Sequence, residues 1–283
     1  MPTAAIRIES IDDPRVDAYR NLRDRTLRGE SIFVAEGQVL TLRLLASGYA
    51  IESLFVADEF ADEIAVVLND RAPLYVSSEK LLLEVVGFPF HRGVLGVGRR
   101  GVPLRFHELL ARRDRAAPLR LAVCPEITKP ENMGLIFRSA SALGIDGVLL
   151  GERCCDPFSR RCLRVSMGAV LQVPFVKTAD LLADLRSLKQ SWNVELVGAV
   201  LDERAEPLAA VQWSPRTAIL FGNEFDGLPS RCLELCDRRV MIPMRAGVDS
   251  LNLGVAAGIF LYQLQSQSPA GGSPSDPPAA SCD

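Results

Sequence analysis

The chain has 283 residues, 48% hydrophobic and 24% charged, which is a globular composition with enough apolar material for one large domain or two ordinary ones. Its formal net charge of −3 argues against a protein that holds nucleic acid through bulk positive charge, although arginines cluster locally. The start has no apolar signal region, and no apolar run is long enough to span a bilayer. We therefore expect a cytoplasmic protein with no membrane partner.

The seven cysteines are odd in number and scattered. The closest groups, Cys154–Cys155–x6–Cys162 and Cys232–x3–Cys236, match no common zinc spacing, and neither histidine lies near them. We expect reduced thiols that pack as small hydrophobic side chains, and no metal site.

The first part of the chain alternates between strand-like and helix-like segments. Strands are expected at 31–37, 51–57, 73–78 and 93–98, with helices at 38–48 and 79–87. Residues 99–118 are polar and charged and carry two prolines, which predicts a connection with one short helix from Arg105 to Arg113. The sequence thus predicts a small α/β domain over 1–100 and a linker over 101–118.

A second α/β series begins at Leu119. Its strands are short continuous apolar runs, as expected in a parallel sheet that is covered on both faces. Strands are expected at 119–124, 147–151, 173–176, 194–200, 217–221 and 239–243, and helices at 132–144, 179–190 and 250–265. This domain spans 119–265. Residues 266–283 are rich in Pro, Gly and Ser, which predicts a disordered tail.

The first motif is N-x-G-x-x-x-R, at Asn132, Gly134 and Arg138, after the first strand of this series. Pro130 marks the loop after the strand, and Asn132 is a good helix N-cap residue. Two interpretations fit. The helix is either an ordinary amphipathic helix with a solvated arginine, or one whose Asn132 and Arg138 reach into a shared site.

The second motif is ILFGNEFDGLP, in which an apolar run stops at Gly222 and a carboxylate, Glu224, follows inside the loop. Glycine at a strand end indicates that another backbone or a ligand comes close. The motif is neither a P-loop nor a dinucleotide fingerprint, because it lacks the Lys-Ser/Thr pair and the G-x-G-x-x-G pattern. It is either an ordinary strand-to-helix turn or a loop whose backbone binds a ligand such as an adenine or ribose edge.

The third motif is IPMRAGVDSLNLGVAAG. Pro243 ends a strand, Gly247 allows a tight turn, and Ser250 can cap a helix that begins near Leu251. Ala256–Gly258 then give this helix a face with almost no side chain. The motif is either a capped, buried C-terminal helix or a smooth surface against which another segment packs closely.

Together and in this order, the motifs resemble the TrmH/SpoU branch of the SPOUT RNA methyltransferases. The resemblance covers about 119–265 and rests on the first motif, on G-N-E-x-x-G-L from Gly222 to Leu228, and on I-P-M … S-L-N from Ile242 to Asn252. Residues 31–57 resemble the ribosomal-protein-like α/β substrate-binding domain often found ahead of such a domain. One departure is Lys129, where the family usually has an aspartate before the proline.

The resemblance implies that the C-terminal parallel-sheet domain is tied in a deep trefoil knot that holds S-adenosylmethionine. The implied cofactor contacts are Leu220, Gly222, Asn223, Ile242, Met244 and Leu251. The implied reaction is methyl transfer to a ribose 2′-hydroxyl of RNA, without a metal. The implied catalytic residues are Arg138, Asn132, Glu224, Ser250 and Asn252. Because a guanidinium is a very weak base, we expect alkoxide stabilisation by Arg138 or phosphate-assisted deprotonation rather than a free neutral guanidine as the base. The other four residues would orient Arg138 and the ribose.

The resemblance also implies RNA as the partner and a homodimer that forms through the knotted domain. The large N-terminal domain favours ribosomal over transfer RNA. Four arginines beside the expected site either bind RNA or are solvated surface charges: Arg153, Arg160, Arg161 and Arg164. One alternative is a catalytically silent RNA-binding or ribosome-assembly protein on the same scaffold, against which the presence of the catalytic residues argues. Another alternative is an α/β enzyme that uses a different nucleotide and resembles the family only by accident.

Overall fold

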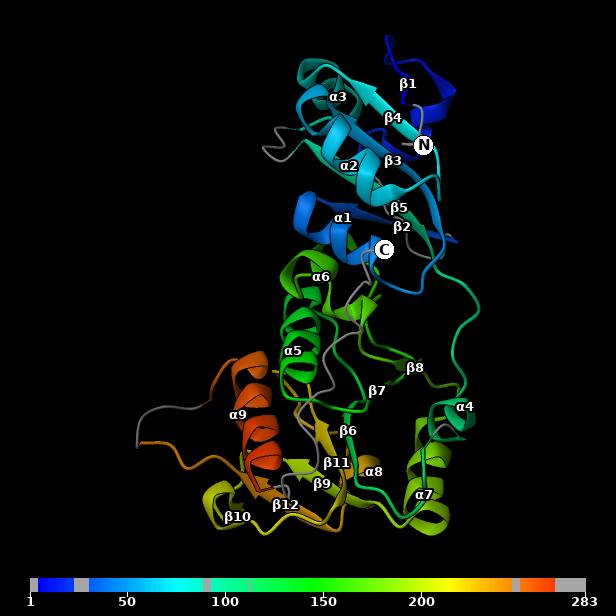
Figure 1. Ribbon diagram of the computed structural model, residues 1–283. Coiled ribbons are helices and arrows are strands. Elements are labelled where there is room, and N and C mark those ends of the chain that lie inside the picture. Colours follow the sequence, from blue (N-terminus) through cyan, green and yellow to red (C-terminus); the bar gives the residue numbers. More distant parts are fainter. Residues whose placement is uncertain (1–4, 23–30, 89–92, 112, 246–249, 268–283) are drawn as a thin grey trace. The chain divides into compact units, whose positions relative to one another are not determined.

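The computed structural model describes residues 5–22, 31–88, 93–111, 113–245 and 250–267 (Figure 1). Most of the tail expected at 266–283 therefore lies outside the described residues. The chain divides into two compact units. Unit 1 comprises Met1–Arg105, Ile127–Arg138 and Arg153–Pro174, and unit 2 comprises Phe106–Glu126, Ser139–Glu152 and Phe175–Asp283. The division crosses helix α5 (Pro130–Ala142), so this helix contributes residues to both units.

Unit 1 contains a five-stranded mixed sheet in the order β1-β4-β3-β5-β2, in which β3 is parallel to β4 and antiparallel to β5. Its strands are β1 (Ile6–Arg7), β2 (Ile32–Glu36), β3 (Ile51–Ala57), β4 (Leu74–Ser77) and β5 (Val94–Arg99). Its helices are η1 (Pro14–Tyr19), α1 (Gln38–Leu45), η2 (Asp58–Phe60), α2 (Ala61–Leu68), α3 (Glu79–Val86), α6 (Arg160–Val165) and η3 (Ala169–Leu171).

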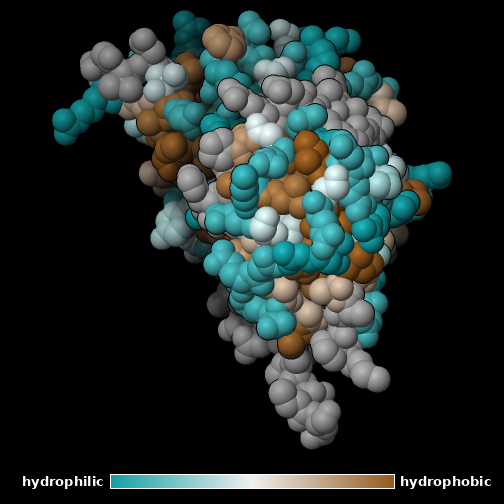
Figure 2. Space-filling model, turned by 90° about the horizontal axis from the view of Figure 1, so that it is seen from above, coloured by the Kyte–Doolittle hydropathy of each residue, from teal (hydrophilic) through white to brown (hydrophobic). Residues whose placement is uncertain are grey.

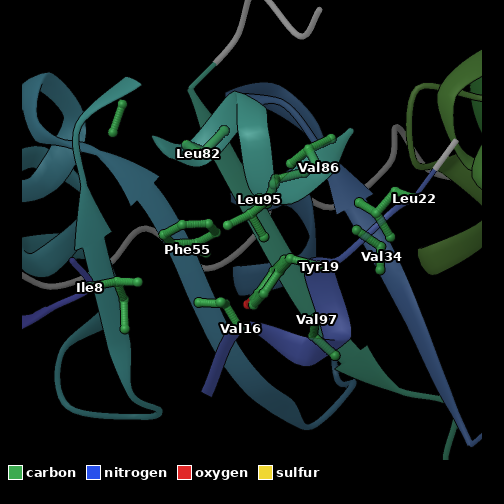
Figure 3. Packing of buried hydrophobic residues seen from close by; sticks show 12 residues of the cluster. Ile8, Val16, Tyr19, Leu22, Val34, Phe55, Leu82, Val86, Leu95 and Val97 are labelled. Atoms are coloured by element: carbon green, nitrogen blue, oxygen red, sulfur yellow. The ribbon is translucent and has the colours of Figure 1, made fainter. Parts of the chain in front are cut away.

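Both faces of this sheet are buried. On one face, residues of η1 and α3 pack with Phe55 and Leu95, as Figure 3 shows. On the other face, residues of α1 and α2 pack with Leu54. Successive side chains of a strand point to opposite faces, so neighbours on β3 enter different layers. This explains why residues 54–57 form an unbroken apolar run.

The first of these cores contains a buried polar group. The hydroxyl of Tyr19 lies 2.8 Å from the Ser53 Oγ, and burial raises the pKa of Tyr19 above its ordinary value. The hydrogen bond satisfies a hydroxyl that would otherwise be costly to bury.

On the face seen in Figure 2, apolar residues form small groups separated by hydrophilic ones.

Unit 2 contains a seven-stranded sheet in the order β10-β12-β9-β11-β6-β7-β8, with every pair parallel. Its strands are β6 (Leu119–Cys124), β7 (Gly147–Leu150), β8 (Phe175–Lys177), β9 (Glu195–Ala199), β10 (Glu206–Pro207), β11 (Arg216–Phe221) and β12 (Arg238–Met241). Its other helices are α4 (Phe106–Ala111), α7 (Leu181–Trp192), η4 (Leu208–Ala210), α8 (Ser230–Leu233) and α9 (Leu253–Ser266).

The strand order of this sheet reverses beside β6. The chain runs from β6 to β7 and β8 in one direction, and then forms β9 and β11 on the other side of β6. Val123 of β6 pairs with Leu220 of β11, so the two carboxyl ends lie side by side. Open parallel sheets bind ligands beyond the carboxyl ends of strands at such a reversal. The segments after Cys124 and Phe221 therefore occupy the expected ligand side.

The fold class expected from the sequence is confirmed, with a small mixed α/β sheet followed by a parallel one. Helices α2 and α6 and strands β1 and β10 were not expected. A short apolar run such as Ala61–Leu68 does not by itself distinguish helix from strand. None of the helices in the described segments combines the length and the apolar content that a membrane span requires.

Candidate active site

Helix α5 carries the first motif. It begins at Pro130, so Asn132 lies inside its first turn, and the expectation that Asn132 caps the helix is wrong. Proline suits the first helical position, where its missing N–H would have no partner inside the helix. Asn132 is buried, with 3% of its surface exposed, whereas Arg138 is exposed. The motif thus presents its guanidinium to solvent and keeps its amide inside the protein.

The glycine of this motif has a packing role. A Cβ at Gly134 would lie 2.8 Å from the Val165 Cβ and 2.9 Å from the Cys162 carbonyl oxygen, both of α6. These distances are too short for a side chain, so the glycine lets α6 approach the backbone of α5 closely. Arg138 follows one helical turn later on the same face of α5.

The loop after β11 is a tight hairpin closed by its own backbone. The Asn223 N–H donates to the Gly227 carbonyl at 3.1 Å, and the Gly227 N–H donates to the Asn223 carbonyl at 3.2 Å. A Cβ at Gly222 would collide with the backbone of Gly227. The close approach that the sequence predicted at Gly222 is therefore made by another backbone segment.

The side chain of Asn223 shapes this hairpin from inside. Its Oδ1 accepts hydrogen bonds from the N–H groups of Phe225, at 2.9 Å, and Asp226, at 2.6 Å. This arrangement is an Asx turn, in which a side chain replaces a backbone carbonyl. Glu224 and Phe225 are exposed at the tip of the loop.

The third motif leads from β12 into α9. Ile242 and Met244 are half-buried after the strand end, and the turn expected at Gly247 lies outside the described residues. The helix begins at Leu253, and its N-cap is Asn252 rather than the expected Ser250. The Asn252 Oδ1 accepts from the N–H of Gly254 at 2.9 Å and of Val255 at 3.3 Å.

The smooth face of α9 packs closely, as its small residues predicted. Ala257 is fully buried, and a Cβ at Gly258 would lie 3.3 Å from the Ser139 Oγ of α5. The rings of Phe260 and Phe221 meet edge to face, with centroids 5.9 Å apart. Because Phe221 ends β11, this contact holds α9 against the strand that leads into the hairpin.

The expected site residues fall into two sets. Asn132 and Arg138 share helix α5 in unit 1. The others lie in unit 2, at the end of β11, after β12 and ahead of α9: Leu220, Gly222, Asn223, Glu224, Ile242, Met244, Ser250, Leu251 and Asn252. Since β11 and β12 are parallel with β9 between them, the loops that follow both strands lie at the same edge of the sheet.

Arg160 and Arg161, which the sequence left as either RNA contacts or solvated surface charges, are held in ion pairs. Arg160 pairs with Glu36, whose side chain is buried, and the Arg161 Nε lies 2.7 Å from the Glu131 Oε1. The N–H of Glu131 and the Arg161 guanidinium lower the pKa of the Glu131 carboxyl. Sequence reasoning missed Glu36, although a carboxylate that ends an apolar strand was a signal for a buried partner.

The cysteines of the described segments are free thiols. Burial raises the pKa of Cys155 and of Cys236 to about 12, and it raises the pKa of Cys162 well above its ordinary value. Among these same segments, no cluster of His, Cys, Asp or Glu could hold a metal ion.

Comparison with known proteins decides the family. Residues 120–262 match the SpoU rRNA Methylase family, which covers the parallel sheet and all three motifs. The chain belongs to this family. Membership confirms the expected enzyme class, an RNA 2′-O-methyltransferase that uses S-adenosylmethionine. The family match also argues against the alternative of an α/β enzyme that uses another nucleotide, because it covers all three motifs.

This SpoU-family chain is similar to proteins that match most of its length. An uncharacterized tRNA/rRNA methyltransferase of Mycobacterium bovis is 38% identical, over 89% of this chain and 88% of the relative. The 23S rRNA (guanosine-2′-O-)-methyltransferase RlmB of Acinetobacter baylyi is 33% identical, over 70% of this chain and 81% of the relative.

The solved structures include a relative with cofactor. The AdoMet-bound rRNA methyltransferase from Sinorhizobium meliloti superposes with a TM-score of 0.77 and 25% identity, over 94% of this chain and 99% of that one. The match extends through the N-terminal sheet, which the family region does not include. The similarity thus covers the mixed sheet as well as the parallel one.

Proposed function

We propose that this chain methylates a ribose 2′-hydroxyl of ribosomal RNA, with Arg138 stabilising the alkoxide that develops on the attacking oxygen. The observation that carries the proposal is the family membership combined with helix α5. This helix follows the central strand β6, and it presents an exposed Arg138 at the family's motif position. Without the family membership and the exposed Arg138, only the fold would support the proposal, and a fold alone does not define a reaction.

The residues present fit S-adenosylmethionine. The Gly222–Leu228 hairpin offers backbone groups at the carboxyl edge of a parallel sheet, and Ile242 and Met244 offer half-buried apolar surface suited to an adenine ring. When bound, the cofactor supplies an electrophilic methyl group. We propose backbone contacts from Leu220, Gly222 and Leu251, with Ile242 and Met244 against the base. Asn223 contributes through its backbone, because its side-chain oxygen already holds the hairpin.

The protein must make a weak nucleophile reactive. A ribose hydroxyl is largely protonated at neutral pH, so the transition state gains most from a cation placed where negative charge develops. Arg138 supplies that cation. Asn132, Glu224 and Ser250 orient the guanidinium and the ribose, and Asn252 does so while capping α9.

Ribosomal RNA is the substrate class that the relatives support. The RlmB protein of Acinetobacter baylyi is named for 23S rRNA, and so is the Bacillus subtilis RlmP protein, which is 26% identical over 92% of this chain. We propose that the N-terminal domain, 1–100, joined through 101–118, binds this RNA and presents it to the domain at 119–265.

We further propose a trefoil-knotted homodimer. Helix α9 packs closely on α5 through Gly258 and Ser139, and its Phe260 ring meets Phe221 of β11; such close packing is what threaded segments need. The opposite side of α9 exposes Val255, Ile259 and Tyr262, spaced four and three residues apart on one face. An apolar helix face of this kind is typical of a subunit interface.

The test is methyl transfer from radiolabelled S-adenosylmethionine to unmodified 23S rRNA and to tRNA transcripts. Arg138→Ala should lower kcat by about 10²–10³-fold, with S-adenosylmethionine affinity unchanged by calorimetry. Arg186→Ala, which removes an exposed arginine of α7 outside the proposed site and the N-terminal domain, is the control and should act like wild type. Methylation of tRNA but not rRNA would overturn the substrate class. Full activity of Arg138→Ala would overturn the catalytic role.

A further inference from the structure

We propose that Glu36 and Arg160 are positioning residues for the methyl transfer. In this view the N-terminal sheet holds helix α6 through their ion pair, and α6 in turn fixes the part of α5 that carries Arg138. The inference rests on the proposed role of Arg138. It assigns to the N-terminal domain a part in catalysis that is separate from RNA binding.

The ion pair joins the last residue of β2 to the first residue of α6. Glu36 is 6% exposed, and its carboxylate accepts a hydrogen bond from the Arg160 Nε. The Arg160 guanidinium also lies over the Phe88 ring, with its central carbon 5.0 Å from the ring centroid. A guanidinium held on two sides in this way has little freedom. The pair therefore defines where α6 begins relative to the sheet.

Aromatic packing beside the pair supports the same junction. The rings of Phe33 on β2 and Phe158, which precedes α6, stack with centroids 4.9 Å apart. The Arg100 guanidinium lies over Phe158 and also pairs with Asp156 at 2.7 Å. These contacts explain why the segment before α6 belongs to the same compact unit as the N-terminal sheet.

Helix α6 in turn contacts α5 and so fixes the position of its first turns. Gly134 of α5 approaches the Cys162 carbonyl and Val165 so closely that a Cβ would have no room. A second ion pair, from Arg161 on α6 to Glu131 in the first turn of α5, lies at 2.7 Å. A displacement of α6 would therefore move the first turns of α5, and Arg138 follows one turn after Gly134. Displacing a catalytic group by about 1 Å can cost as much as about 100-fold in rate.

The experiment measures kcat and KM for 23S rRNA transcript at saturating S-adenosylmethionine. Glu36→Gln should lower kcat by about 10-fold to 100-fold in folded protein, with cofactor affinity unchanged by calorimetry. Glu52→Gln is the matched control on β3 of the same sheet, because it breaks the partly exposed pair with Arg99. The control should retain wild-type kcat and KM.

A double variant separates positioning from stability. Breaking a buried pair leaves one charge uncompensated, so Glu36→Gln alone is expected to lower the melting temperature. Removing both charges, in Glu36→Gln with Arg160→Met, should restore most of the melting temperature. If the pair positions α5, kcat stays low in this double variant although the protein is stable again.

The outcomes distinguish this inference from the proposed function. Recovery of kcat together with the melting temperature would show that the pair only stabilises the fold, and it would overturn the inference. A rise in KM for RNA with unchanged kcat would also overturn it, because the sheet would then act through RNA binding alone. If Arg138→Ala itself retains full activity, the proposed function fails first, whatever Glu36→Gln does.

Discussion

Asn252 links the expected chemistry of the site to the stability of a helix. The family resemblance implied a catalytic role for it, and the structure shows that its side chain caps α9. A loss of activity on removing this side chain would therefore have two explanations. A variant that retains the helix cap distinguishes these two explanations.

We expect Asn252→Ala to lower the free energy of unfolding by about 1 kcal/mol, because two N–H groups at the start of α9 lose their acceptor. Asn252→Asp should retain stability, since aspartate is an equally good N-cap residue. Urea unfolding measures both. A stable Asn252→Asp protein that no longer methylates RNA would support a chemical role for the amide, whereas equal stability of Asn252→Ala and wild type would contradict the cap.

Two half-buried thiols, Cys155 and Cys236, lead to a prediction about how the rate of thiol labelling depends on pH. Burial raises the pKa of Cys155 and Cys236 to about 12, and the thiolate is the reactive form. At pH 7.5 both should react with iodoacetamide roughly 1000-fold slower than an unfolded thiol, with the rate rising about tenfold per pH unit up to the raised pKa. Mass spectrometry of labelled peptides, with and without urea, measures this. Rapid labelling of Cys236 in the folded protein would contradict it.

Among the helices and strands, the contact between α5 and α6 depends on one missing side chain. Gly134 stands in the middle of α5, where glycine is otherwise unfavourable by about 1 kcal/mol relative to alanine. Its presence there is explained by α6, whose backbone and Val165 occupy the space. The packing requirement outweighs the helix propensity.

We expect Gly134→Ala to destabilise the protein despite the better helix former. Overpacking costs about 1–3 kcal/mol, which exceeds the gain of up to about 1 kcal/mol in propensity. Gly48→Ala is the control, because a Cβ there meets nothing within 4 Å, and its stability should match or slightly exceed wild type. Thermal unfolding measures both, and a rise in melting temperature for Gly134→Ala would contradict the contact.

Local sequence predicted most elements because their signals are local. The strand expected at 119–124 coincides with β6, and the helix expected at 79–87 coincides with α3 to within one residue. Helix α6 was missed because its six residues, RRCLRV, are too few to show a helical period. The N-cap of α9 was assigned to the wrong residue because Ser250 and Asn252 are both good cap residues.

For the molecule as a whole, the exposed side of α9 predicts association. Val255, Ile259 and Tyr262 are 51%, 39% and 60% exposed, which is costly for an apolar helix face in a monomer. We expect wild type to sediment as a dimer at micromolar concentration and Ile259→Glu to sediment as a monomer, because a carboxylate would be buried without a partner. Gln265→Glu adds the same charge at an exposed polar position of α9, so it is the matched control and should remain dimeric. A monomeric wild type would contradict the interface.

The types of most elements, the two-part α/β organisation and the family could all be inferred from the amino-acid sequence, because hydrophobic periodicity and motif spacing are properties of short stretches. Which groups meet became clear only in three dimensions. The backbone at Gly227 makes the close approach at Gly222, and Glu36 is the partner of Arg160. Such contacts follow from strand order and helix packing, which bring together residues with no fixed spacing along the chain.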